Sequence, residues 1–291
     1  MADLISVIVT TWNREDALDA VLRSLAMQTD RDFEVIVADD GSGEATARLI
    51  EEWKPKFRCP LKHVWQEHRG FRAAEIRNRG ILASEGTYCI FLDGDCIARP
   101  GFVATHRSLS EEGWFVTGNR ILMSEQLTAT ILREKLDPET WSYREWAKER
   151  GRGGINRTVP LVRLPLGPLR KLRWRAWRGA RSCNLGIWRS DLDRVDGFDC
   201  AYEGWGREDS DLLVRLLHAG IRRKDGVFAT GVLHLWHPTA DRSWLSDNDQ
   251  KLEDVKSNGQ IRARQGLSAM SDAGDEKPIT RQVHGQLGAR S

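Results

Sequence analysis

Apolar runs of strand length recur in the first third of the chain, and each passes directly into small or acidic polar residues. They are residues 7–13, VIVTTWN, residues 35–42, VIVADDGS, and residues 89–95, CIFLDGD. Between the first two runs, apolar residues recur at helical spacing over 17–25. This alternation predicts an α/β fold in which a mainly parallel central sheet is flanked by helices, in a single domain.

The same pattern locates further elements. Strands are expected at 33–38, 87–92, 114–117 and 182–188, and helices at 45–53, 72–83, 134–150 and 210–218. Asn13 is expected to cap the first helix, with Asp16 three residues later. Beyond about residue 266 small and polar residues predominate, which predicts a disordered tail.

Acidic residues follow the predicted strands. Asp40, Asp93 and Asp95 all lie where strands end. Ligands of open parallel sheets bind at the carboxyl ends of the strands, so these side chains are expected to converge. Two carboxylates separated by one residue can hold a hard divalent cation, which would neutralise a departing diphosphate. A solvated acidic turn is the alternative for residues 93–95, but their position after a buried strand favours a site.

A second acidic motif is EGWGREDSD at residues 203–211. Carboxylates in the first turn of a helix are favoured by its dipole, so helix capping is one interpretation, and it is the one we prefer for Asp211. Glycines flank Trp205 on both sides, which is typical of a loop folded around a ligand. A carboxylate in this loop could remove a proton from an attacking hydroxyl.

Two histidines lie in VLHLWHP at residues 232–238. A histidine in an apolar run is often a core residue with its hydrogen bonds satisfied. Added to two oxygen ligands, however, an imidazole nitrogen would suit manganese or a similar ion. We prefer His234 as this third ligand, and His237 is the alternative.

Composition narrows the partners and the compartment. A formal charge of +2 in 291 residues gives no indication of nucleic acid as a partner. The five cysteines are scattered without CxxC spacing, which indicates a reducing compartment and no structural zinc. The start of the chain does not resemble a signal peptide, and no apolar run approaches ~20 residues, so a cytoplasmic location is expected.

Charge is concentrated in one segment. Arg157 to Arg181 carries eight basic residues and no acidic one, together with Trp174 and Trp177. This segment could lie on an anionic membrane, peripherally at the inner face of the plasma membrane. It could equally be an acceptor-side loop that binds phosphate, or a surface loop without a specific partner. Prolines break its first half, so an amphipathic helix is possible only from about Leu169 onward.

Taken together and in this order, the motifs resemble those of family-two inverting glycosyltransferases with the GT-A, Rossmann-like fold. The resemblance spans roughly residues 6–238, and residues 203–209 are especially similar to the galactosyltransferase and chondroitin-polymerase branch. It implies the following organisation: a GT-A domain at 1–245, with a nucleotide-binding half at 1–110 and an acceptor-binding half at 111–245 that contains the basic insert 157–181, then a carboxyl-terminal helix at 246–265 and a disordered tail at 266–291.

The resemblance also implies roles for individual residues. Thr10 and Asp40 correspond to positions that hold the uridine, and Asp93 and Asp95 to the metal and ribose motif. His234 corresponds to a metal ligand seen in related branches.

On the acceptor side, Asp209 matches the general base, Glu208 beside it would contact the acceptor or the sugar, and Trp205 would contact the acceptor. Three positions transfer less directly: Arg72 and Arg77 as donor contacts or as a solvated helix face, and Asn184 as an acceptor contact or an ordinary strand start.

The implied reaction is a single displacement that inverts configuration at the anomeric carbon. A hexose or N-acetylhexosamine would pass from a UDP-sugar, with Mn²⁺ or Mg²⁺, to a hydroxyl of a lipid-linked, lipopolysaccharide or capsule-type glycan. Two other classes are a nucleotidyltransferase and a non-catalytic polybasic membrane or glycan-binding module. The first would usually carry a glycine- and lysine-rich loop, which residues 10–14 do not provide, and the second gives no reason for the clustered acids.

Overall fold

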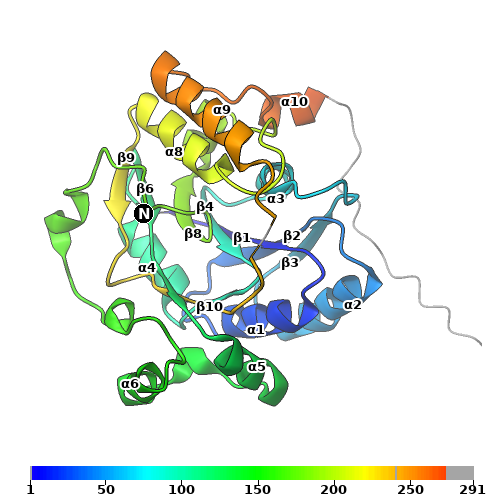
Figure 1. Ribbon diagram of the computed structural model, residues 1–291, viewed down its shortest axis with the longest axis vertical. Coiled ribbons are helices and arrows are strands. Elements are labelled where there is room, and N and C mark those ends of the chain that lie inside the picture. Colours follow the sequence, from blue (N-terminus) through cyan, green and yellow to red (C-terminus); the bar gives the residue numbers. More distant parts are fainter. Residues whose placement is uncertain (1, 240, 273–291) are drawn as a thin grey trace, which may run out of the picture.

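The computed structural model describes residues 2–239 and 241–272, and its centre is a seven-stranded sheet (Figure 1). Its order is β3-β2-β1-β4-β8-β6-β9, with β8 antiparallel to both neighbours and the other pairs parallel. The strands are β1 (Ile5–Thr11), β2 (Phe33–Asp39), β3 (Leu61–Trp65), β4 (Tyr88–Asp93), β6 (Trp114–Thr117), β8 (Asn184–Trp188) and β9 (Arg222–Asp225). The predicted α/β fold with a mainly parallel sheet is therefore confirmed.

A smaller sheet and ten α-helices among the described residues complete the fold. The smaller sheet has the order β5-β10-β7, with β5 (Cys96–Ile97), β10 (Val232–His234) and β7 (Arg120–Leu122). The helices are α1 (Glu15–Ala26), α2 (Glu44–Trp53), α3 (Ala73–Ala83), α4 (Phe102–Leu109), α5 (Glu125–Glu134), α6 (Tyr143–Gly151), α7 (Arg189–Val195), α8 (Glu208–His218), α9 (Leu245–Asn258) and α10 (Leu267–Asp272). In Figure 1, α1 and α2 lie below the sheet and α3 and α8 lie above it.

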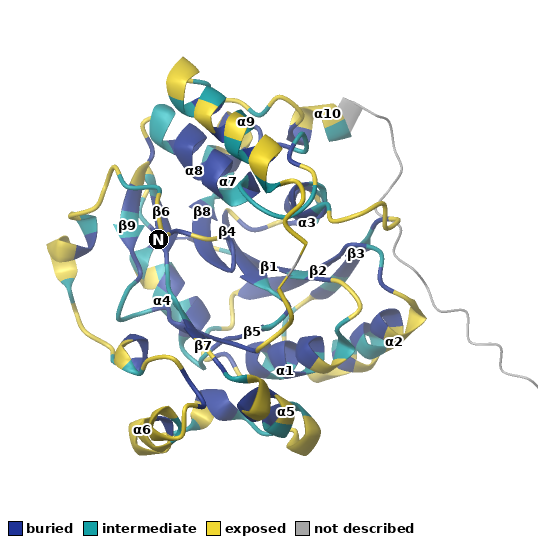
Figure 2. Cartoon of the chain, in the orientation of Figure 1, coloured by how far each residue is buried: buried dark blue, intermediate teal, exposed yellow. Residues whose placement is uncertain are grey.

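Both faces of the central strands are buried, which explains their continuous apolar runs. Along β4, Tyr88, Ile90 and Leu92 pack on the side of α1, whereas Cys89 and Phe91 pack on the side of α3 and α8. Figure 2 shows the central strands and the inward helix faces as buried. The sheet is therefore a rigid platform whose strand ends carry the polar motifs.

Asn13 does not cap the first helix as expected. The cap position is Arg14, and Asn13 has a left-handed φ of 44°, which asparagine tolerates better than most residues. Its side chain accepts a hydrogen bond from the backbone N of Gly43 at 3.1 Å. Asn13 thus fastens the loop after β1 to the loop after β2.

The carboxyl-terminal part differs from the expected helix at 246–265 and disordered tail. The helix α9 ends at Asn258, followed by Gly259 with a φ of 71°. Residues 267–272 form α10, where disorder was expected, because Leu267 is buried and the Ser268 backbone N donates to Asp196 at 2.8 Å. The remaining tail, 273–291, lies outside the described residues.

Membrane crossing can be tested on the helices directly. Within residues 2–239 and 241–272, none of them combines the length and the apolar character needed to cross a bilayer.

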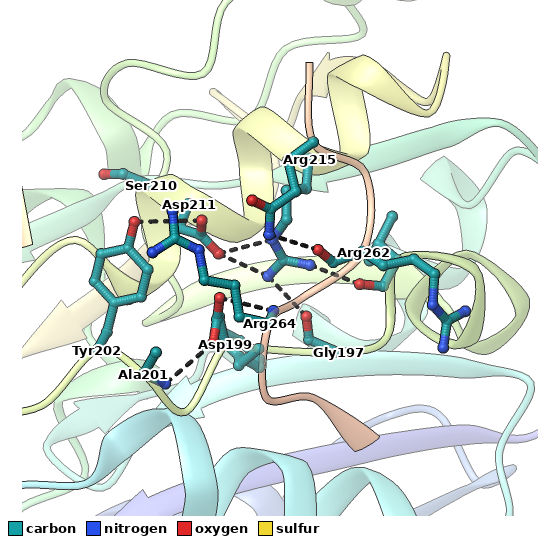
Figure 3. Close-up of polar contacts among 12 residues, drawn as sticks. Gly197, Asp199, Ala201, Tyr202, Ser210, Asp211, Arg215, Arg262 and Arg264 are labelled. Carbon is teal, nitrogen blue, oxygen red and sulfur yellow. Dashed lines mark hydrogen bonds and ion pairs between the residues drawn. The ribbon is translucent and has the colours of Figure 1, made fainter. Parts of the chain in front are cut away.

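A buried ionic network fixes α8 in place (Figure 3). Asp211 and Arg215 are fully buried, and the Arg215 Nε donates to Asp211 Oδ2 at 2.8 Å. The other guanidinium nitrogens donate to the carbonyl oxygens of Val195 and Gly197, at 2.6 and 2.9 Å. Tyr202 donates its hydroxyl to Asp211 at 3.3 Å. Asp211 therefore has a structural role, but as the buried partner of Arg215 and Tyr202 and not as the helix cap preferred above, since α8 has no side-chain cap.

Replacing Arg215 should destabilise the whole fold. Arg215→Leu would leave Asp211 buried without its partner, and we expect a loss of about 3–5 kcal/mol in unfolding free energy. Urea denaturation measures this loss. The matched control is Arg48→Leu, which removes a solvent-exposed ion pair with Glu44. This variant should lose no more than about 1 kcal/mol of unfolding free energy. Similar small losses in both variants would show that the buried network does not hold α8.

Candidate active site

The register of the central strands brings the polar motifs to one edge of the sheet. Thr10 on β1 lies level with Ala38 on β2 and with Asp93 on β4. The Thr10 hydroxyl donates to Asp93 Oδ1 at 3.2 Å. The backbone of Gly94 packs closely against β1, because its N donates to Thr10 O at 2.7 Å. A Cβ at this position would lie only 2.7 Å from the same oxygen. Glycine is therefore required in the turn between Asp93 and Asp95.

Asp40 occupies the neighbouring strand end. Its carboxylate is buried and accepts hydrogen bonds from Gln66 Nε2 at 2.6 Å and from the Arg72 backbone N at 3.1 Å. Burial raises the pKa of Asp40 above its ordinary value, although these hydrogen bonds oppose the shift. The preceding Asp39 is different, because it pairs with buried His63 at 3.0 Å and supports the sheet.

An aromatic pair beside Asp40 was not predicted from the sequence. The rings of Trp12 and His68 stack with centroids 4.6 Å apart and planes 10° apart, and Trp12 is 49% exposed. The His68 Nδ1 lies 2.9 Å from the Asp40 carbonyl oxygen. The pair offers a flat, partly open surface next to a buried carboxylate, and its only sequence signal is the position of Trp12 directly after β1.

Arg77 links the two acidic motifs. From α3 its guanidinium donates to Asp93 Oδ1 at 3.3 Å and to Glu208 Oε1 at 3.0 Å, and it is almost entirely buried. Burial disfavours its charge, but the carboxylates of Asp93 and Glu208 outweigh burial and raise the pKa of Arg77. The alternative of a solvated helix face is therefore wrong for Arg77. Arg72 is more open, and its side chain pairs with Glu75 at 2.6 Å.

Both histidines considered as metal ligands flank Asp95. His234 Nε2 lies 3.7 Å from Asp95 Oδ1, and His237 Nε2 lies 3.4 Å from Oδ2. The strand β10 positions His234 by pairing it with Cys96 on β5. Burial lowers the pKa of His234, so its ring stays neutral and keeps a free lone pair at neutral pH.

The donor atoms around Asp95 fit a divalent transition metal. One ligand atom each from Asp95, Cys96 and His234 lies within 4.8 Å of the others, and Asp93 forms a similar group with Cys96 and Cys183. Carboxylate oxygens suit both magnesium and manganese, whereas an imidazole nitrogen favours transition metals. The mixed set therefore favours manganese over magnesium. Cys96 was read from the sequence only as one of several scattered cysteines.

Glu208 and Asp209 open α8 after a loop with unusual backbone angles. Gly204, Gly206 and Arg207 have φ values of 66°, 110° and 79°. Such angles are costly for arginine, so surrounding contacts must impose them. The buried Asn248 of α9 supplies two, donating to the carbonyl oxygens of Glu203 and Gly206 at 2.8 and 3.0 Å.

The two carboxylates of this turn differ in environment. Glu208 is buried, and burial together with the neighbouring Asp209 raises its pKa despite the opposing charge of Arg77. Asp209 is half-buried, and its Oδ1 accepts a hydrogen bond from the Ser210 backbone N at 2.7 Å. Its Oδ2 accepts no hydrogen bond from the described residues. Asp209 thus retains an acceptor oxygen near the site.

Family models match most of the described chain. The model described as glycosyl transferase family 2 matches residues 6–158, which is more than half of the chain. A second model, described as the N-terminal domain of galactosyltransferase, matches residues 170–235. The chain belongs to glycosyl transferase family 2. Membership in this family favours a transferase over the nucleotidyltransferase and the non-catalytic module considered from the sequence.

Curated relatives of this family 2 chain carry names that describe different transfer and synthesis reactions. Validoxylamine A glucosyltransferase of Streptomyces hygroscopicus subsp. limoneus is 30% identical over 229 residues, covering 75% of this chain and 49% of that protein. Chondroitin synthase of Escherichia coli is 25% identical over 250 residues, covering 78% and 34%. The chain thus spans about half or less of the length of these relatives.

Solved structures share the GT-A fold of this family 2 chain. S. aureus TarS 1–349 in complex with UDP has a TM-score of 0.59 at 15% identity, covering 91% of this chain and 68% of that chain. GalNAc-T7 with UDP, GalNAc and Mn²⁺ has a TM-score of 0.61 at 16% identity, covering 87% and 48%. At these identities the likeness shows the fold.

Trp205 and Asn184, both expected to contact the acceptor in this family 2 site, differ in how accessible they are. Trp205 is partly exposed, with the Arg242 guanidinium 5.1 Å from its ring centroid. Asn184 is buried, and its amide N donates to the carbonyl oxygens of Asn119 and Thr230, while its oxygen lies 3.1 Å from His106 Nε2. Asn184 therefore joins β8 to its neighbours and is not free to contact an acceptor.

Replacing each histidine separately should identify the metal ligand. We expect His234→Ala to lower Mn²⁺ affinity by more than the ~10- to 100-fold typical of losing an outer partner, and His237→Ala to lower it less. Titration of free Mn²⁺ by electron paramagnetic resonance gives both affinities. The reverse ranking would assign the ligand to His237, and unchanged affinity in both variants would remove the histidines from the site.

Proposed function

We propose that this chain is a metal-dependent inverting hexosyltransferase that transfers a hexose or N-acetylhexosamine from a UDP-sugar to a hydroxyl of a glycan. The observation that carries the proposal is the double ion pair of Arg77, which joins Asp93 of the strand-end motif to Glu208 of the helix motif. The two motifs lie more than 100 positions apart in the sequence, yet they share one guanidinium.

The donor side is proposed to lie along the ends of β1, β2 and β4. Thr10 and Asp40 are proposed to hold the uridine, which is supported by their position at the ends of the neighbouring strands β1 and β2 and by the stacked Trp12 and His68 rings beside Asp40. Support comes from TarS and GalNAc-T7, which share the fold and were solved with UDP. A divalent metal bound by Asp93, Asp95 and His234 would supply charge neutralisation for the leaving diphosphate.

The acceptor side is proposed to centre on Asp209. Its free Oδ2 can take the proton of the acceptor hydroxyl as that oxygen attacks the anomeric carbon. Displacement from the face opposite the leaving group inverts the configuration. The ion pair between Glu208 and Arg77 fixes the first turn of α8. The backbone of Asp209 is therefore held in one position, which would orient its carboxylate toward the acceptor hydroxyl. Arg72 and Trp205 are proposed to contact the donor and the acceptor, respectively.

The acceptor class is a further part of the proposal. A surface glycan, lipid-linked or of the lipopolysaccharide or capsule type, is supported by the chondroitin synthase relative, whose name describes a polysaccharide product. We also propose that Arg157 to Arg181 contacts an anionic membrane peripherally at its cytoplasmic face.

Asp209 and Asp95 should fail in different ways. Asp209→Asn should keep nucleotide-sugar affinity within about twofold while lowering kcat by at least ~10²-fold, because the base acts only in the transition state. Asp95→Asn should weaken both affinity and kcat, since a metal serves both. Glu203→Gln, an exposed acid in the same loop, is the matched control and should stay near wild type. Near wild-type transfer by Asp209→Asn would remove it as the base.

A panel of nucleotide sugars, with and without Mn²⁺, tests the reaction class. Sugar-dependent release of nucleoside diphosphate is expected, and proton NMR of the product should show the inverted anomer. Release of pyrophosphate instead would indicate a nucleotidyltransferase, and retention of configuration would contradict the single displacement.

A further inference from the structure

The basic segment, residues 157–181, is fixed along the outer strand β9. The Arg223 backbone N donates to Trp174 O at 3.0 Å, and its guanidinium donates to the carbonyl oxygens of Ala176 and Arg178. Buried Arg170 donates to Asp225 O and to Val227 O. In Figure 1 the segment runs around the side of the molecule that carries β9 and β6. Its outward side chains therefore stand on an ordered backbone.

The segment contains no amphipathic helix. Its regular structure is limited to two short 3₁₀ turns, Val159–Leu161 and Gly167–Lys171, and the chain beyond Leu172 makes turns. The helix considered possible from about Leu169 onward is therefore not formed. Hydrogen bonds to β9 and to the loop after it take the place of helical hydrogen bonds.

Large apolar side chains nevertheless face solvent along this segment. Leu164, Leu169, Leu172 and Trp174 are 43%, 59%, 75% and 36% exposed. Figure 2 shows much of the segment as exposed. Single exposed apolar residues need no explanation, but several within eleven positions on an ordered backbone indicate a surface that is covered in use.

Arginines without acidic partners lie beside these apolar residues. None of Arg173, Arg175, Arg178, Arg181 and Arg222 forms an ion pair with a carboxylate of residues 2–239 or 241–272. Arg175 and Arg222 lie 4.1 and 5.2 Å from the Trp174 ring, which holds the guanidinium groups near the surface and leaves their N–H groups available. Such a cluster attracts a surface of negative charge.

A cavity opens where the segment meets α8 and α9. It has a volume of about 580 Å³, and its walls include Trp174, Trp177 and Leu217. Arg175 and Arg222 contribute positive charge to its lining. Aromatic walls with guanidinium groups suit a phosphate group attached to an apolar body.

We propose that this face docks on an anionic phospholipid bilayer. Leu164, Leu169 and Leu172 enter the interfacial layer, the unpaired arginines contact lipid phosphates, and the cavity receives one phospholipid headgroup. The leucines decide for a bilayer over an anionic polysaccharide, because a polysaccharide offers no apolar layer to cover them. The inference depends on the proposed function only for the membrane-bound acceptor, since none of these leucines and arginines is among the residues proposed to hold the donor or the metal or to act as the base.

Co-sedimentation with vesicles tests the proposal. The full chain should bind vesicles that contain phosphatidylglycerol and not vesicles of phosphatidylcholine alone, and high salt should weaken binding. The variant R173Q/R175Q/R178Q should bind on the order of 100-fold more weakly, because each basic residue near an anionic surface contributes about fivefold. L169S/L172S should lose on the order of tenfold. The matched controls are R133Q and L82S, whose residues are exposed on α5 and α3.

Several outcomes would overturn the proposal. The proposal fails if the wild-type chain binds neither vesicle type or binds both equally. It also fails if R173Q/R175Q/R178Q and L169S/L172S both bind as tightly as the wild-type chain. Binding of an acidic polysaccharide through the same arginines, without vesicle binding, would assign the surface to a polymer. Transfer to a water-soluble acceptor is measured in parallel and should be unchanged in the variants. If the wild-type chain shows no sugar transfer, the proposed function is refuted, and vesicle binding stands as a separate result.

Discussion

The arrangement of the site depends on one buried guanidinium. Arg77 lies between Asp93 at the end of β4 and Glu208 at the start of α8, and without its charge two carboxylates would face each other in a water-poor environment. Its double pairing ties the end of β4 to the helix that carries Asp209. Arg215, which pairs with Asp211 on the same helix, ties α8 to the carbonyl oxygens of Val195 and Gly197. The contacts of two buried arginines, Arg77 and Arg215, thus fix the direction in which α8 approaches the sheet.

Much of the fold could be predicted from the sequence because the central strands are buried on both faces. Continuous apolar runs with abrupt polar ends located β1, β2 and β4 closely. The pattern was less informative at the carboxyl-terminal end. The helix α10 is short and polar, and it is stabilised by the burial of Leu267 and by hydrogen bonds from Ser268 to Asp196, which are tertiary contacts that no local pattern shows.

The site could be predicted in part for the same reason. Asp40, Asp93 and Asp95 follow strand ends, and parallel strands end at one edge of a sheet. The partners of Arg77 and the stacking of Trp12 on His68 could not be predicted, because they join segments distant in sequence. Asn184 was considered a ligand contact because it is a polar residue at the start of a strand. Its side-chain amide instead forms hydrogen bonds with Asn119, Thr230 and His106.

The helix α9 lies beyond residues 6–158 and 170–235, which are the ranges shared with the family models. It nevertheless shapes the loop before Glu208 and Asp209, because Asn248 holds the backbone of Glu203 and Gly206 while Trp244 packs against Gly204. Divergence among related proteins can therefore reshape this loop through an element outside the shared core. A substitution at Asn248 or Trp244 would change the contour of this loop while leaving Glu203, Glu208 and Asp209 in place.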